Sequence, residues 1–255
     1  MNQIEAELRF AGDRADIARK CVEITTHLLA LGLPDDYWNF IELGRAAKKN
    51  FAQRFSNALA QKIADALRPA FPGILPDEDG RGQETKARAI GGSKKLDVAY
   101  PLTGLGGLGL AVSIKTINFL DEKTGRYTKN VKRVDGELRA EAQDCHQRQP
   151  YAFLVAIILL PSDAATDGID GVSSLKHAAN VYRKRSRRRT VEDEHALFET
   201  AYLGLYESSG ANFGRVVLFD VGDDVPDKGP PAATVSFAEV IKAIVKGFKA
   251  RDDRA

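Results

Sequence analysis

The sequence has little cysteine, little net charge and no long apolar run, and each shortage narrows the class of protein. Its 255 residues include only Cys21 and Cys145, in unrelated contexts, which excludes a disulfide framework or a cysteine zinc site. The formal net charge is +2, so composition alone argues neither for nor against a nucleic-acid partner. The longest apolar run, AFLVAIILL, is far too short to span a membrane.

The first residues also lack the features of a targeting segment. MNQIEAELRF carries acidic residues and no apolar stretch, so we predict no signal peptide. With 44% hydrophobic and 28% charged residues, the composition is typical of a soluble globular protein. We therefore expect a cytoplasmic protein without a membrane partner.

Helical periodicity dominates the first part of the chain. Apolar residues recur at helical spacing over 2–31 and again over 36–68, with GLPDD between the two segments. Prolines in RPAFPGILP end the second helix. The pattern predicts a helical N-terminal region, residues 1–70, packed on an α/β core, residues 71–255, as one compact unit.

The rest of the chain alternates between strand and helix patterns. QETKARAI and KKLDVAY predict two strands around a Gly-Gly turn, and GLGGLG, which precedes a strand rather than opening a helix, is interpreted as a connector. We predict further strands over 109–119, 151–160 and 215–221. Helices are expected over 132–148, 191–203 and from a cap at Ser236 to 250, with a polar, basic region over 162–190. This order favours a mixed β-sheet with helices on both faces.

One strand, LAVSIKTINF, has a lysine in an apolar setting. Lys115 and Ser113 are two residues apart, so both side chains leave the same face of the strand. Asp97 in KKLDVAY shares the less apolar face of its own strand with Ala99. An acid and a lysine projecting together from adjacent strands make either a structural ion pair or a site for a hydrated divalent metal.

These residues resemble the PD-(D/E)XK nuclease superfamily, best known for type II restriction endonucleases. The matching positions are Asp97, then Ser113-Ile114-Lys115, followed by a helix and an apolar strand, so that the resemblance covers roughly 36–160. It implies a restriction-endonuclease-like α/β fold and a Mg²⁺-dependent nuclease, with Mn²⁺ as a substitute. Asp97 would hold the metal, and Lys115 would position or activate the water that attacks phosphorus and leaves a 3′-hydroxyl.

Ser113 departs from the family pattern. Most members carry Glu or Asp there as the second metal ligand, whereas a subset of restriction enzymes has serine and takes the carboxylate from the following helix. Here that helix offers Glu137 and Glu141 one turn apart, with Arg133 one turn before them. We expect Glu137 as the relocated ligand and Glu141 as the second choice.

Further candidates lie outside this motif. Glu84 opens the strand paired with that of Asp97, and Glu42 matches an upstream helical glutamate that many family members carry near the metal. Cations near Glu42 and in the tract RKRSRRR would face DNA phosphates and release counterions. These cations, together with Arg133, are Arg45, Lys48, Lys49, Arg183, Lys184, Arg185, Arg187, Arg188 and Arg189.

The sequence therefore predicts an endonuclease acting on double-stranded DNA, either a type II restriction enzyme or a related defence nuclease. Cutting both strands of a palindrome would favour a homodimer. Two alternatives remain open: a catalytically decayed nucleic-acid-binding or scaffold protein on the same fold, and an effector nuclease activated by a ligand.

Overall fold

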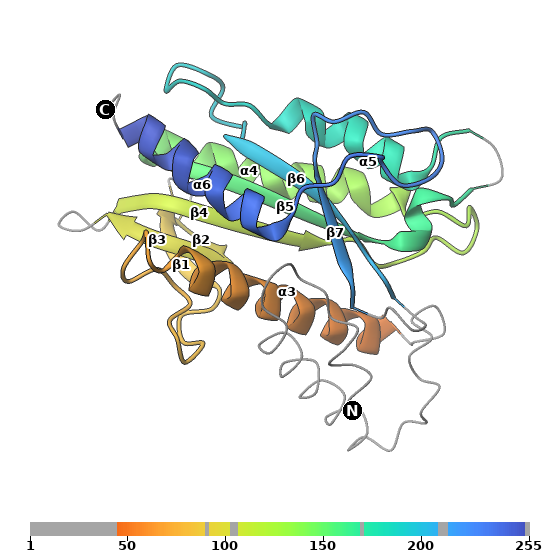
Figure 1. Cartoon of the computed structure of the whole chain (residues 1–255), viewed down its shortest axis with the longest axis horizontal. Helices are drawn as coiled ribbons and strands as arrows, with labels where there is room; N and C mark the ends of the chain where they lie inside the picture. Colours follow the sequence, from red (N-terminus) through yellow and green to blue (C-terminus); the bar gives the residue numbers. More distant parts are fainter. Residues whose placement is uncertain (1–44, 90–91, 103–106, 169–170, 209–213, 253–255) are drawn as a thin grey trace.

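The computed structural model describes residues 45–89, 92–102, 107–168, 171–208 and 214–252 (Figure 1). Its helices are α3 (Arg45–Leu67), α4 (Val131–Arg148), α5 (Ser174–Tyr182) and α6 (Phe237–Asp252). Its strands are β1 (Thr85–Ala89), β2 (Gly92–Leu96), β3 (Val98–Leu102), β4 (Gly107–Thr116), β5 (Phe153–Pro161), β6 (Thr200–Tyr206) and β7 (Val216–Asp220). None of the helices in these ranges combines the length and apolar character needed to cross a lipid bilayer.

Five strands form one mixed sheet in the order β3-β4-β5-β6-β7. The three central strands are parallel, with α4 as the crossover from β4 to β5, and both edge strands run antiparallel to their neighbours. A separate hairpin of β1 and β2 leads directly into β3. The predicted class, a mixed α/β sheet flanked by helices, is confirmed.

Helices lie on both faces of this sheet (Figure 1), and an apolar core fills the space between each face and its helices. One core joins α3 and α6 to alternate strand residues such as Val112, Ile114 and Val155. The other joins α4 and α5 to the intervening residues, among them Ala111 and Leu154. Because strand side chains alternate between faces, the continuous apolar run of β5 supplies both cores at once.

A short segment pairs with one residue of each edge strand. Leu75 exchanges two backbone hydrogen bonds with Ala99 of β3, at 2.8 and 3.0 Å. At the opposite edge, Val235 forms an antiparallel bridge with Leu218 of β7, and its N–H donates at 2.7 Å. Neither edge of the sheet is therefore left open along its whole length.

Most predicted elements are confirmed by the described residues. The antiparallel pair β1 and β2, the crossover helix, the apolar strand after it and the final helix are present within a few residues of their expected bounds. Ser236 caps α6 as predicted, because its hydroxyl accepts the N–H of Glu239 at 3.2 Å and its own N–H donates to that carboxylate at 2.7 Å. The predicted helix over 2–31 lies outside the described residues.

Two predictions are wrong in part. The expected helix over 191–203 is absent, since residues 200–206 form β6 between β5 and β7. Its residues TAYLGLY supply both cores, a requirement that a strand meets and one side of a helix does not. The basic region over 162–190, where no helix was predicted, contains α5. The Ser173 side chain caps the start of this helix by accepting the Lys176 N–H.

Candidate functional site

Asp97 lies at a bend between β2 and β3, not inside one continuous strand as the sequence suggested. Leu96 packs in the α4 core and Val98 in the α3 and α6 core, so the regular alternation is broken at this residue. Oδ2 of Asp97 accepts the backbone N–H of Ile114 on β4 at 2.7 Å. The bend thus brings a carboxylate against the next strand, beside Ser113 and Lys115.

Ser113 and Lys115 leave the face of β4 that α4 covers, as their spacing predicts. The Ser113 hydroxyl donates to Oε1 of Glu141, and the Lys115 ammonium donates to Oε2 of the same carboxylate at 3.2 Å. Glu141 is only 7% exposed. A serine, a lysine and a buried helical glutamate are therefore joined on one face of the sheet.

The carboxyl group of Asp97 has a raised pKa. Burial raises its pKa to about 6, against the opposing effects of the Ile114 N–H and the positive charge of Lys115. The negative charges of Glu141 and Glu84 raise it further. A group that is charged only above about pH 6, in a site that already holds two other acids, is stabilised in its ionised form by any additional cation.

For Lys115, neighbouring charges have a larger effect on the pKa than burial does. Burial lowers its pKa, but the negative charges of Glu141 and Asp97 outweigh burial, so that the net shift is upward. The side chain consequently remains protonated at neutral pH. Lys115 can donate hydrogen bonds and stabilise negative charge, whereas it cannot accept a proton from water in this state.

Glu137, the first choice for the relocated acid, faces solvent instead. Its carboxylate pairs with Arg133 one turn earlier on α4, and its side chain is 44% exposed. One helical turn therefore separates the glutamate that contacts Ser113 and Lys115 from the one that does not. The geometry favours Glu141 over Glu137 as the second acid of the site.

Glu84 interacts with Lys115 and Asp97 through its charge, but its hydrogen bonds go to other residues. Its carboxylate accepts from Lys95 at 2.5 Å and from Gln53 of α3 at 3.2 Å. The hydrogen bond from Lys95 lowers the pKa of Glu84, and the charge of Lys115 contributes in the same direction. Its backbone has φ of 52°, in the left-handed region that non-glycine residues seldom adopt.

Several upstream candidates cannot be placed against this cluster. Glu42 lies outside the described residues. The backbone of Arg45, Lys48 and Lys49 belongs to the start of α3, but their side chains are also outside the described part of the chain. Predictions about these four residues remain predictions.

The residues of the cluster suit Mg²⁺ if water and substrate complete the coordination. In the described ranges, no three His, Cys, Asp or Glu side chains come together to hold a metal on their own. Mg²⁺ is, however, commonly bound through one or two carboxylates plus waters and substrate phosphates. Oδ1 of Asp97 makes no hydrogen bond to any described residue, and each Glu141 oxygen has a second lone pair beyond those that Ser113 and Lys115 use.

The basic tract is only partly available to a ligand. Arg185 pairs with Asp135 of α4 through two contacts of 2.6 and 3.2 Å, and Arg183 donates to the carbonyls of Val221 and Asp223. Arg188 is buried. The exposed residues of the tract are Arg183, Lys184, Arg187 and Arg189, and of these Arg183 already donates to the two carbonyls. Half of the predicted DNA-contacting tract therefore binds the protein itself.

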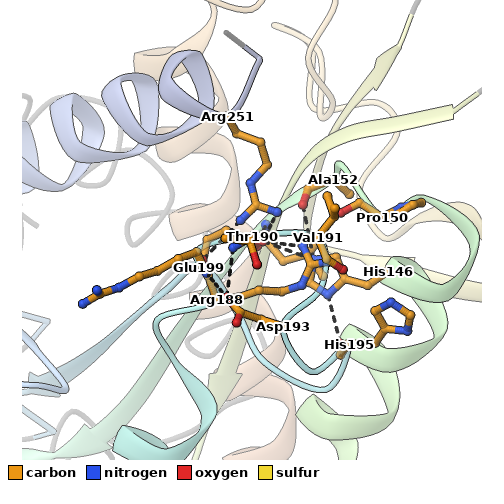
Figure 2. Close-up of polar contacts among 12 residues, drawn as sticks. His146, Pro150, Ala152, Arg188, Thr190, Val191, Asp193, His195, Glu199 and Arg251 are labelled. Carbon is orange, nitrogen blue, oxygen red and sulfur yellow. Dashed lines mark hydrogen bonds and ion pairs between the residues drawn. The ribbon is translucent and has the colours of Figure 1, made fainter. Parts of the chain in front are cut away.

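A second charged cluster, which the sequence did not suggest, surrounds Glu199 (Figure 2). Oε1 of this carboxylate contacts Arg188 at 3.0 Å and Arg251 at 2.7 Å, with His146 Nε2 at 3.4 Å. Oε2 accepts the backbone N–H of Leu154 at 2.6 Å. Four groups from distant parts of the chain thus converge on one acid, and no local spacing could have indicated it.

Comparison with known proteins adds no relative. No family model matches the chain, and searches of curated proteins and of solved structures found no match. The functional argument therefore rests on the geometry of the chain itself.

Proposed function

We propose that this protein is a Mg²⁺-dependent endonuclease of restriction-endonuclease-like fold that hydrolyses phosphodiester bonds in double-stranded DNA. The observation that carries the proposal is the meeting of Asp97, Ser113, Lys115 and Glu141 on one face of the sheet. The order of elements, an antiparallel pair followed by a helical crossover to a parallel strand, supports it as well. Both features match the resemblance drawn from the sequence.

Each residue would have a distinct task. Asp97 and Glu141 would hold the cation, and Mg²⁺ when bound supplies Lewis-acid polarisation of a phosphoryl oxygen. Lys115, protonated between these acids, would orient the attacking water and stabilise charge that develops on the phosphate. Ser113 would hold the Glu141 carboxylate in place through its hydrogen bond. Oδ1 of Asp97, the oxygen that does not accept the Ile114 N–H, would be the more mobile ligand.

Cleavage of supercoiled plasmid in Mg²⁺ tests the proposal with two matched pairs of variants. Lys115→Ala and Glu141→Gln are expected to slow cleavage by about 100-fold or more, the usual cost of removing an electrostatic contact to the transition state. Lys123→Ala and Glu137→Gln change exposed residues of the same types and should cleave at the rate of the wild type. Equal rates in Lys115→Ala and the wild type would contradict the proposed role of this cluster.

Metal binding can be measured without cleavage. Mg²⁺ should raise the thermal unfolding midpoint of the wild-type protein, because a ligand that binds only the folded state stabilises it. Asp97→Asn and Glu141→Gln should reduce this shift, whereas Glu137→Gln should keep it. A shift that is the same in all four proteins would place the metal elsewhere.

A catalytically inactive nucleic-acid-binding protein on the same fold is a second candidate, because one observation favours it. Both oxygens of Glu141 already accept hydrogen bonds from protein groups, which would also describe a purely structural ion pair. In that case the wild type would retard duplex DNA in a gel and cut none, in Mg²⁺ or in Mn²⁺. An effector nuclease would instead begin to cut when its activating ligand is added, and a restriction enzyme would act as a homodimer.

A further inference from the structure

Every acidic residue of α4 already pairs with a cation. These ion pairs are Asp135–Arg185, Glu137–Arg133, Glu141–Lys115 and Asp144–Lys94. Most of the paired cations come from other elements, so several cations of the helix itself are left without an acid. Lys132 and Arg139 are exposed, and neither forms an ion pair or a side-chain hydrogen bond with a described residue.

The natural partner of both cations would be Asp135. Lys132 stands three residues before it and Arg139 four residues after it, the spacings at which side chains of a helix meet. Both oxygens of this carboxylate instead accept from the guanidinium of Arg185, at 2.6 and 3.2 Å. The packing of the basic tract against α4 therefore balances the local acid and leaves two positive charges on the helix surface.

The elements beside these two cations add positive charge and no acid. Lys184 is exposed, has no described partner and directly precedes the arginine that contacts Asp135. Burial lowers the pKa of His177 on α5, and the positive charges of Arg126 and Lys132 lower it further. Neither α5 nor the tract over 183–190 contains an acidic residue. The positive potential at the start of α4 is therefore continuous with that of α5 and the tract.

Acids beyond the two ends of this surface are Asp121, Asp163, Asp167, Glu192 and Glu194. The first three lie near the start of α4, where they bind Lys129, Tyr127 or the first residue of α5. The two glutamates belong to the segment that contacts His146, about 10 Å beyond Arg139 along the helix at roughly 1.5 Å per residue. The surface between these ends keeps its positive charge.

Gly136 gives the surface an open centre. It lies one turn from Lys132 and one turn from Arg139, it is exposed, and no atom lies within 4 Å of an added Cβ. The two cations are seven residues apart, or about 10 Å along the helix axis. This separation corresponds to about three phosphates of one DNA strand, which follow each other every 3.4 Å or so along the duplex axis.

We propose that the surface formed by Lys132, Arg139 and Lys184 binds the phosphate backbone of duplex DNA outside the reactive site. The inference rests on the proposed function, because that function supplies DNA as the substrate. Arg139 and Glu141 are two residues apart, so they leave nearly opposite sides of α4. The surface therefore holds a flanking part of the duplex and contributes to affinity, through the release of counterions from the phosphates it contacts.

Fluorescence anisotropy of a labelled 30-base-pair duplex, titrated with the full chain in EDTA, tests the surface without cleavage. Gly136→Glu places a carboxylate between the two cations and should weaken binding by about tenfold or more. Gly136→Gln adds a side chain of the same size without charge and should stay within about threefold of the wild type. Both replace a helical glycine by a better helix former, so both should fold. Equal affinities in the two variants, or no binding by the wild type, would overturn the inference.

The salt dependence of binding gives a second readout. Each phosphate contact contributes about 0.9 to the slope of log K against log of the salt concentration. The double variant Lys132→Gln/Arg139→Gln should therefore lose about 2 from this slope. Lys246→Gln, at an exposed lysine of α6 on the other face of the sheet, should keep it. A slope that is equal in the double variant and the wild type would contradict the inference.

Plasmid cleavage by the same proteins separates this inference from the proposed nuclease. Cleavage by the wild type, together with equal DNA affinity of the two Gly136 variants, would overturn the surface and leave the nuclease. Binding that follows the two variants as expected, without any cleavage, would remove the nuclease and support the surface. Tighter binding to vesicles of anionic lipid than to the duplex, lost in Gly136→Glu, would assign the surface to a membrane and overturn the inference.

Discussion

Two charged clusters anchored on α4 differ in how fully their hydrogen-bonding capacity is used. Around Glu199, three basic side chains and a backbone N–H contact one buried carboxylate, so its negative charge is opposed from several sides. Around Asp97, one carboxylate oxygen remains free of described partners and burial opposes its ionisation. The first arrangement holds the fold together, and the second is suited to an added cation.

The largest expected effect comes from breaking the saturated cluster. Glu199→Gln leaves two arginines without their shared carboxylate, one of them with a side chain 0% exposed. Removal of one partner from a buried ion pair costs about 3–5 kcal/mol, so we expect a loss of this size in the free energy of unfolding. Urea unfolding measures it, with the exposed Glu192→Gln as control. Equal midpoints for both variants would show that the cluster contributes little.

A substitution in the Asp97 cluster should instead raise the free energy of unfolding. Asp97→Asn keeps an acceptor for the Ile114 N–H but removes a charge that burial opposes. Folded Asp97 holds its proton up to about pH 6 and unfolded Asp97 only to about 3.8, so the wild type loses stability as pH rises through this window. Without Mg²⁺, the variant should be more stable by roughly 2–3 kcal/mol above pH 6, with no difference below about pH 4. Urea unfolding at pH 4 and pH 8 checks this sign.

Glu141 links Lys115 and Ser113 and also acts on Asp97 through space. In Glu141→Gln, one of the negative charges that raise the pKa of Asp97 disappears, so that pKa should fall below about 6. Titration of the Asp97 carboxyl by NMR measures the change. An unchanged pKa would mean that the charge of Glu141 does not act on this carboxyl.

The smallest effect is expected for the neighbouring glutamate. Glu137→Gln breaks an exposed pair one turn apart on α4 and should change the free energy of unfolding by less than about 0.5 kcal/mol. Thermal or urea unfolding beside Glu141→Gln provides the comparison. A loss as large as that of Glu141→Gln would remove the distinction that the geometry draws between them.

Local periodicity was sufficient to predict part of the candidate site. Strand alternation placed Ser113 and Lys115 on one face, and helical spacing placed a glutamate opposite them. The choice between Glu137 and Glu141 depended on how far along the strand α4 packs, a tertiary distance that no local pattern contains. The sequence around the bend at Asp97 contains no glycine or proline that would have predicted it.

The Glu199 cluster was unpredictable for a different reason. Its members come from α4, the basic tract, the residue before β6 and the end of α6, and each resembles an ordinary surface charge in the sequence. The same long-range packing removed Arg188 from the exposed tract and turned the expected helix over 191–203 into a central strand. Elements defined by their own residues were predicted, whereas elements defined by distant partners were not.

The short bridges at Ala99 and Leu218 bear on how copies of this chain can meet. An open edge strand offers unpaired backbone groups to a neighbouring molecule, which leads to continuous intermolecular sheets or to aggregation. Here one residue of each edge strand, Ala99 or Leu218, already pairs with a segment of the same chain. A second copy of the chain could therefore not add a continuous strand along either edge of the five-stranded sheet without displacing one of these segments.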